Sequence, residues 1–206
     1  MQNNRNNRTI YISYSQLYCK AILAGMMIAL AGTVNLSVDN KYLGSFLFSF
    51  GLITIIIQDW WLYTGKVGVL EIPGDIDYLL VTLLGNFVGV LVISALIRCT
   101  RFGESLKETA RAIVDLKLQD NLFSIFFLAC FCGIMMYLAV DGYRKNKNLL
   151  MVIFPIMIFI LAGFEHSIAN MFYFITAEEL SLNGLIYILV MVLGNTCGSV
   201  FMKLAN

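Results

Sequence analysis

The chain has 206 residues, of which 59% are hydrophobic and only 13% are charged, and its formal net charge is +1. This composition excludes an ordinary soluble domain, and the small net charge gives no indication of a nucleic-acid partner. We therefore expect an integral membrane protein with little mass outside the lipid bilayer, folded as a single transmembrane domain over residues 1–206.

The first 16 residues form a polar segment that is rich in asparagine from Met1 to Asn7. They lack the charged and then apolar pattern of a cleavable signal peptide. Mostly apolar stretches follow, each close to the roughly 20 residues that a membrane-spanning helix needs. Six stretches are predicted to cross the membrane as helices, at 17–37, 42–58, 78–97, 122–140, 149–176 and 183–202.

One long polar segment, residues 98–121, separates the third predicted span from the fourth. Its apolar residues Leu106, Ala110, Ile113 and Leu116 recur at helical spacing. This pattern predicts an amphipathic surface helix that links two halves of the chain.

The two halves resemble each other in sequence. Leu84–Gly89 in the third span reads Leu-Gly-Asn-Phe-Val-Gly, and Leu193–Gly198 in the sixth reads Leu-Gly-Asn-Thr-Cys-Gly. The second and fifth spans both carry polar residues in their latter part. Three spans in each half require an inverted repeat, and paired interrupted helices in corresponding positions indicate a transport site.

The only histidine of the chain, His166, follows Glu165. The preceding run from Leu149 to Leu161 carries no charge, so this pair is expected at or near membrane depth. An ionisable pair at that depth indicates a functional site. The alternative is a histidine whose polar atoms are simply satisfied inside the core.

The five cysteines fall mostly inside predicted spans, where they are expected to be small apolar fillers. Cys130 and Cys132 are two residues apart and point to different faces of a helix. They therefore predict neither a disulfide framework nor a metal site, and no cofactor is expected.

Residues Gly163–Phe172 read Gly-Phe-Glu-His-Ser-Ile-Ala-Asn-Met-Phe. This segment resembles the signature of the formate/nitrite transporter family, which also includes hydrosulfide and lactate channels. Further matches extend the resemblance over nearly the whole chain, at Ala21–Gly25, Leu62–Gly65, Leu84–Gly89 and Leu193–Gly198. The resemblance implies an all-α integral membrane protein with six transmembrane helices, an aquaporin-like inverted 3+3 repeat and broken helices two and five. It also implies a homopentamer with one pore in each protomer.

The resemblance assigns candidate pore residues one by one. It places the central pore histidine at His166, between Glu165 and Asn170, and a threonine that faces this histidine at Thr64. It places a lysine of the pore vestibule at Lys117. The hydrophobic constrictions fall on Phe48, Leu52, Leu62, Tyr63, Met136 and Phe159.

Each polar candidate has an expected role. Lys117 would attract anions to the mouth of the pore, with a solvated surface charge as the alternative. His166 would donate a proton or a hydrogen bond to the anion. Glu165 is expected to orient polar groups of the loop rather than to contact substrate, because its charge would repel an anion.

The chain departs from the family pattern at four places. Gly133 stands where the family usually has an asparagine that faces the pore, and Lys66 stands where a small polar residue is usual. The segment Gly65–Pro73 is shorter than the usual second half-helix. Ile175 and Thr176 replace the proline that usually follows the signature.

The leading hypothesis for function is a channel-like transporter that passes small monovalent weak-acid anions, namely formate, nitrite or hydrosulfide, together with a proton. A bacterial inner membrane is expected, and the cluster Arg144–Lys147 favours cytoplasmic termini. The alternative is a non-conducting relative that acts as a sensor or scaffold. A membrane enzyme is a third hypothesis, which the absence of a convergent Cys, Asp and His set in the sequence disfavours.

Overall fold

The computed structural model describes residues 12–71 and 74–206, and these residues form nine helices without a β-strand. The helices are α1 (Tyr14–Ser37), α2 (Lys41–Ile57), α3 (Tyr63–Lys66), α4 (Ile76–Arg98), α5 (Gly103–Gln119), α6 (Leu122–Asn146), α7 (Leu150–Leu161), α8 (Ser167–Thr176) and α9 (Leu182–Ala205). The all-α prediction is confirmed. Of the predicted polar N-terminal segment, residues 1–11 lie outside the described residues, and α1 begins inside the remaining part.

Among the described residues, four helices are long and apolar enough to cross a membrane: α1, α4, α6 and α9. Of the two other predicted spans, the stretch at 42–58 is covered by α2 without a break, and only the stretch at 149–176 is interrupted within its predicted bounds. The chain leaves helical conformation after α2 and resumes it in α3, and the stretch predicted at 149–176 is divided into α7 and α8. The interruptions fall where the sequence carries its polar residues.

Polar and apolar side chains are distributed as in a membrane protein. Large apolar side chains such as those of Phe50, Phe123 and Leu193 are exposed on the outside of the helices. Polar side chains, including those of Asn86 and Asn195, are buried in the interior. Because lipid cannot hydrogen-bond to polar groups, this distribution suits a chain surrounded by hydrocarbon.

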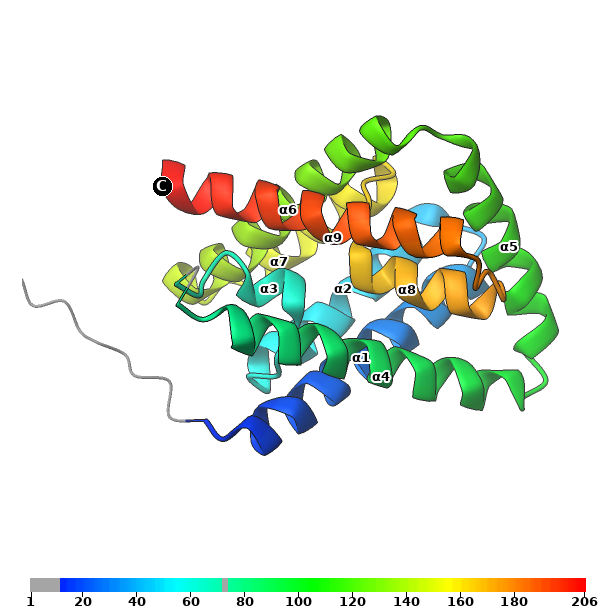
Figure 1. Ribbon diagram of the computed structural model, residues 1–206, viewed down its shortest axis with the longest axis horizontal. Helices are drawn as coiled ribbons and strands as arrows, with labels where there is room; N and C mark the ends of the chain where they lie inside the picture. Colours follow the sequence, from blue (N-terminus) through cyan, green and yellow to red (C-terminus); the bar gives the residue numbers. More distant parts are fainter. Residues whose placement is uncertain (1–11, 72–73) are drawn as a thin grey trace, which may run out of the picture.

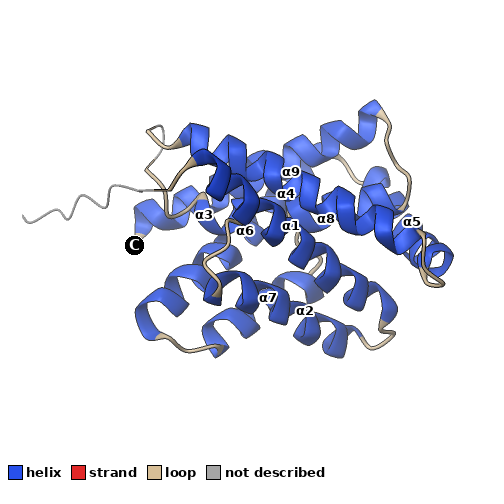
Figure 2. Ribbon diagram, turned by 90° about the horizontal axis from the view of Figure 1, so that it is seen from below, coloured by secondary structure: helices blue, strands red, loops and turns tan. Residues whose placement is uncertain are grey.

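The helices pack as two similar sets (Figure 1). α1 lies against α4, α6 lies against α9, and α2 and α7 lie side by side along one side of the molecule (Figure 2). The long helices touch closely at glycines: a Cβ atom on Gly25 would lie 2.1 Å from Asn86 O, and one on Gly133 would lie 2.3 Å from Asn195 O. Small residues permit such close approach.

Position 133 therefore faces α9 and has no room for a side chain. The expectation that a side chain at position 133 would face the pore is wrong, whereas the residue that the family usually has there stays a prediction. The glycine is the packing partner of Asn195, as Gly25 is of Asn86.

The predicted amphipathic helix of the linker is α5. It buries Leu106, Ala110 and Val114, whereas Leu116 is 69% exposed, so the buried stripe differs from the predicted one at its C-terminal end. An ion pair between Lys107 and Glu178, at 2.6 Å, ties α5 to the connection between α8 and α9.

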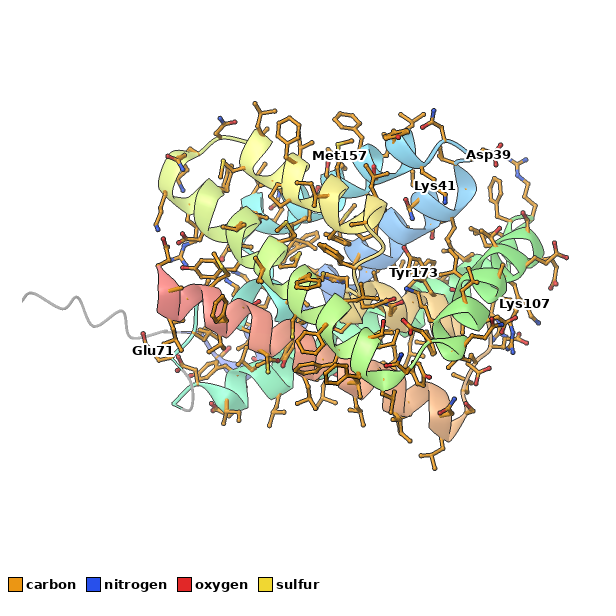
Figure 3. The ribbon with its side chains drawn as sticks, turned by 90° about the horizontal axis from the view of Figure 1, so that it is seen from above. Asp39, Lys41, Glu71, Lys107, Met157 and Tyr173 are labelled. Carbon is orange, nitrogen blue, oxygen red and sulfur yellow. The ribbon has the colours of Figure 1, made fainter. Side chains whose placement is uncertain are left out.

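The molecule has two ends, which Figure 3 shows by labelled residues: Lys107 of α5 lies at one end and Glu71 lies at the other. We call them the linker end and the terminal end. The terminal end is where α1 begins and α9 finishes (Figure 1).

Candidate functional site

The two helix interruptions meet at one buried polar contact. Thr64 Oγ1 lies 2.9 Å from His166 Nε2, although the two residues are 102 positions apart in the chain. Thr64 is 1% exposed and His166 is 2% exposed. The predicted pairing of these two side chains is thus present in the geometry.

Asn86 of α4 holds the start of α3. Its Oδ1 accepts a hydrogen bond of 2.8 Å from Tyr63 N–H. Its Nδ2 donates two further hydrogen bonds of 2.8 Å, to Ala21 O on α1 and to Trp61 O in the interruption. Backbone groups that leave the helical pattern are satisfied in this way without water.

Asn195 of α9 holds the start of α8 with the same pattern. Its Oδ1 accepts a hydrogen bond of 2.8 Å from Ser167 N–H. Its Nδ2 donates to Ala129 O at 2.8 Å and to Glu165 O at 2.7 Å. From the sequence, the Leu-Gly-Asn motifs indicated only a repeat, and this role of the asparagines was missed. A buried asparagine at matching places in two halves is the signal that could have identified it.

His166 is the N-cap residue of α8, and its capping hydrogen bond determines which ring nitrogen carries the hydrogen atom. Its Nδ1 accepts a hydrogen bond of 3.1 Å from Ala169 N–H. A neutral imidazole whose Nδ1 accepts must carry its hydrogen on Nε2. The Nε2–H group therefore points at Thr64 Oγ1 and is the donor that the site offers.

Aromatic rings line the same centre. The ring of Phe159 on α7 stacks on the His166 ring with centroids 5.6 Å apart, and Phe48 on α2 meets Phe159 edge to face at 6.1 Å. The structure thus brings these two predicted constriction residues together with His166. Because Leu52 follows Phe48 by one helical turn, it lies on the same buried face of α2.

The other predicted constriction residues are also buried. Leu62 precedes α3 and Met136 lies on α6, and each is 1% exposed. Tyr63 points elsewhere, because its hydroxyl group lies 2.8 Å from Thr196 Oγ1 on α9. The structure therefore places Tyr63 against α9 rather than beside His166.

Lys117 and Glu165 form a partly buried ion pair on the linker side of His166. The Lys117 Nζ atom lies 2.7 Å and 2.5 Å from the two carboxylate oxygens of Glu165. Asn170 Nδ2 donates a hydrogen bond of 2.8 Å to Glu165 Oε2. The carboxylate thus contacts the predicted vestibule lysine and the predicted pore amide, and it balances the charge of Lys117.

Two polar atoms beside this ion pair have no hydrogen-bond partner among the described residues: Asn170 Oδ1 and Ser167 Oγ. Both residues are buried. A buried polar atom without a partner needs an explanation. Each of these oxygen atoms is able to accept a hydrogen bond.

The interruption on the terminal side carries different residues. Lys66 Nζ lies 3.1 Å from Asp59 Oδ1 and 4.6 Å from the centroid of the Trp61 ring. Lys20 of α1 donates a hydrogen bond of 3.3 Å to Asp59 Oδ2. We call Lys20, Asp59, Trp61 and Lys66 the terminal-end cluster.

The half-helices differ in length. α3 has four residues and α8 has ten, and α8 continues through Ile175 and Thr176, the positions of the replaced proline. The prediction that Gly65–Pro73 is shorter than the usual half-helix of the family stays a prediction, and residues 72 and 73 lie outside the described residues. Within the residues that the structure covers, no group of three or more His, Cys, Asp or Glu side chains is placed to hold a metal ion.

An all-helical membrane fold with two interrupted helices that meet at a buried polar pair defines a protein of the transporter class. The family model for the formate/nitrite transporter matches residues 3–206. The chain therefore belongs to the formate/nitrite transporter family, and the resemblance seen at Gly163–Phe172 is confirmed.

Named relatives cover part of the chain. The protein called "Formate channel FocA" of Haemophilus influenzae is 31% identical over 151 residues, which are 65% of this chain and 52% of the relative. That of Escherichia coli K12 is 27% identical over 182 residues, 74% of this chain and 62% of the relative. The chain thus spans about half to three fifths of the length of these relatives.

Solved structures match nearly the whole chain. A structure described as "Pentameric formate channel with formate bound" is similar with a TM-score of 0.81 and 25% sequence identity, covering 93% of this chain and 95% of that one. An "FNT family ion channel" is similar with a TM-score of 0.77 and 24% identity, covering 93% and 87%. The second likeness concerns the fold alone.

Proposed function

We propose that this chain is a channel-like transporter that passes small monovalent weak-acid anions, such as formate, nitrite or hydrosulfide, together with a proton. The observation that carries this proposal is the buried contact between Thr64 and His166, beside the ring of Phe159. A full charge is costly in such an apolar passage, whereas the neutral acid crosses at much lower cost. The relatives named as formate channels support the choice of anion.

The architecture proposed for this function is an aquaporin-like inverted repeat of three spans and three spans in one domain. Its six spans are α1, α2 with α3, α4, α6, α7 with α8, and α9. The identical hydrogen-bond patterns of Asn86 and Asn195 support the repeat. Because each half has an odd number of spans, the second half is inverted across the membrane.

The assembly and location follow from the same proposal. The likeness to a pentameric formate channel supports a homopentamer with one pore in each protomer. The basic residues at Arg144–Lys147 support cytoplasmic termini in a bacterial inner membrane. The terminal end would then face the cytoplasm.

His166 acts, in this proposal, as a hydrogen-bond donor to the passing anion through Nε2–H. To give up a proton and remain neutral, the ring must first receive one on Nδ1, which now accepts from Ala169 N–H. Proton-linked flux therefore requires either that this cap opens in each cycle or that the anion is protonated before it reaches His166. The two routes predict different flux and different pH dependence when His166 is replaced.

Lys117 acts, in this proposal, by attracting anions toward the linker-end mouth. Its ammonium group is paired with Glu165, so the net charge of the pair is zero and its attraction acts at short range. The exposed fraction of the Lys117 side chain, 16%, leaves part of it open to the mouth.

The test is uptake of formate, nitrite and hydrosulfide into proteoliposomes that contain the purified chain, between about pH 5 and 8, where histidine ordinarily titrates. We expect saturable uptake well above that of empty liposomes, and uptake that rises as the pH falls. Absence of uptake for all three anions would reject transport and would favour a non-conducting relative.

Two variants separate the roles of the central pair. His166→Asn keeps an N-cap for α8 but removes the ring from Thr64, because asparagine is a good capping residue with a shorter side chain. Thr64→Val keeps the shape and removes only the hydroxyl group. We expect His166→Asn to abolish flux or its pH dependence and Thr64→Val to lower flux several-fold. Unchanged flux and pH dependence in His166→Asn would reject the donor role.

A further inference from the structure

The terminal-end cluster resembles an occupied anion site. One carboxylate, that of Asp59, lies between two ammonium groups, with Oδ1 at 3.1 Å from Lys66 Nζ and Oδ2 at 3.3 Å from Lys20 Nζ. A small carboxylate ion held between two lysines would make the same contacts. Asp59 therefore stands where a small anion would bind.

The position of Lys66 in the repeat places it at a mouth of the proposed pore. Trp61 O accepts from Asn86 as Glu165 O accepts from Asn195, so Trp61 and Glu165 correspond. Five residues later in each half come Lys66 and Asn170. Asn170 contacts Glu165 at the linker side of His166, and Lys66 contacts Trp61 at the terminal side.

Asp59, whose carboxylate occupies this site, is much more exposed to solvent than Lys66. The side chain of Asp59 is 70% exposed, whereas that of Lys66 is 22% exposed and rests on the Trp61 ring. Asp59 also has a φ of +49°, a backbone conformation that aspartate and asparagine adopt more readily than most residues. The lysine is thus fixed and the carboxylate is the part that solvent reaches.

Positive charge exceeds negative charge within the cluster. Lys20 and Lys66 share the single carboxylate of Asp59, and Arg144 adds a further positive charge near Lys66. An open surface depression of about 700 Å³ adjoins the cluster; Lys20, Asp59 and Trp61 are among the residues that line it, and Lys66 lies behind them. This depression gives a hydrated anion room to approach Lys20 and the carboxylate of Asp59.

We infer that Lys20 and Lys66 form a binding site for small monovalent carboxylates at the terminal-end mouth, and that Asp59 is its internal competitor. The arriving anion displaces the Asp59 carboxylate from the two ammonium groups, and Asp59 takes its place again when the anion leaves. The inference rests on the proposed function, which supplies the anion.

Tryptophan fluorescence tests the site directly, because Trp61 contacts Lys66 and the chain has only one other tryptophan, the adjacent Trp60. A Trp60→Phe variant of the full chain leaves only the ring on which Lys66 rests. Sodium formate is titrated into this protein in lipid nanodiscs, at constant ionic strength held by a bulky sulfonate. We expect a saturable change in Trp61 emission.

Two further substitutions in this background move the midpoint in opposite directions. Lys66→Met keeps the apolar stem on Trp61 and removes the charge, so we expect a midpoint raised about fivefold or a signal that no longer saturates. Asp59→Asn keeps the backbone conformation and removes the competitor, so we expect a midpoint lowered several-fold. Lys145→Met is the matched control, because Lys145 pairs with Asp141 outside the cluster, and it should leave the midpoint unchanged.

The inference is overturned if formate causes no saturable change, if Lys66→Met leaves the midpoint where it was, or if Asp59→Asn raises it. Formate flux is measured on the same proteins in liposomes. Saturable fluorescence without flux keeps the site and rejects transport, whereas flux without a fluorescence change rejects the site and keeps transport.

Discussion

The two helix interruptions of this chain are held by the same hydrogen-bond pattern, which we call the asparagine frame and which is built on Asn86 in one and Asn195 in the other. They differ in the side chains that surround this frame. In both, a buried asparagine from a long helix accepts from the first N–H of a half-helix and donates to two carbonyl groups. At the linker side the frame carries Glu165 and Asn170, and at the terminal side it carries Trp61 and Lys66.

The difference shows which parts of the site are constrained by the backbone. Peptide groups that leave a helix inside hydrocarbon must find partners, so each half needs its asparagine. The other side chains at the interruptions are not needed to satisfy peptide groups, so they can differ between the two interruptions. One end therefore holds a charge-balanced pair of Lys117 and Glu165, and the other holds an excess of positive charge around Asp59.

The largest effect is expected from breaking the frame itself. Asn86→Leu and Asn195→Leu each remove the partner of one half-helix N–H and of one carbonyl group in the interruption, Trp61 O or Glu165 O, and also remove a second bond to a carbonyl group inside α1 or α6. We expect each substitution to lower the free energy of unfolding by at least about 3 kcal/mol. Denaturation in mixed detergent micelles measures this. A loss in one half only would contradict the equivalence of the two frames.

The next largest effect is expected from the side chains at the linker-side interruption. Glu165→Gln leaves the ammonium group of Lys117 partly buried beside a neutral amide, so we expect a loss of about 3 kcal/mol in the free energy of unfolding. The freed positive charge should also lower the anion concentration for half-maximal flux. The double variant Glu165→Gln with Lys117→Met should recover stability, since it removes the unpaired charge. Lack of recovery would show that the loss comes from the hydrogen bond between Asn170 and Glu165 rather than from the unpaired charge of Lys117.

A smaller effect is expected at Tyr63, which differs from its neighbour Thr64 in where it points. Tyr63→Phe removes a hydroxyl group that contacts Thr196, so we expect a loss of about 1 kcal/mol in stability and no change in anion flux. Thr64→Val, measured beside it, should lower flux. A fall in flux with Tyr63→Phe would place the tyrosine in the pore after all.

The smallest effect is expected at the ties between α5 and the connection that precedes α9. A hydrogen bond from Ser181 and the positive charge of Arg111 lower the pKa of the Glu179 carboxyl group. Because its pKa is lower in the folded protein, the stabilisation is present above the unfolded pKa and is lost as the pH falls through the folded pKa. Glu179→Gln should cost at most about 1 kcal/mol at neutral pH.

Unfolding measured at neutral and at acidic pH checks this prediction. The difference in stability between the parent and Glu179→Gln should disappear at acidic pH. A difference that stays constant with pH would mean that the charge of Glu179 contributes nothing to the folded state.

Several parts of the fold and of the site were predictable from particular residues. The polar residues around Thr64 and around His166 correctly indicated that the helices are interrupted after α2 and between α7 and α8, whereas the six-span inverted repeat stays a prediction. The pairing of Thr64 with His166 came from the family resemblance and is present at 2.9 Å. Leu116 was assigned to the buried face of the linker helix and is exposed, because spacing alone does not say how far a stripe stays covered.

The sequence by itself determined the class of the chain, the order of its helices and the identity of its polar residues. It did so because a helix that crosses hydrocarbon carries few charged residues, and each residue that departs from this pattern can be read directly from the sequence. Only the tertiary structure decided which polar groups meet. The asparagine frames, the neutralisation of Lys117 by Glu165 and the bridging of Lys20 and Lys66 by Asp59 join residues from separate helices. Such contacts depend on how the helices pack, which the spacing along one helix does not encode.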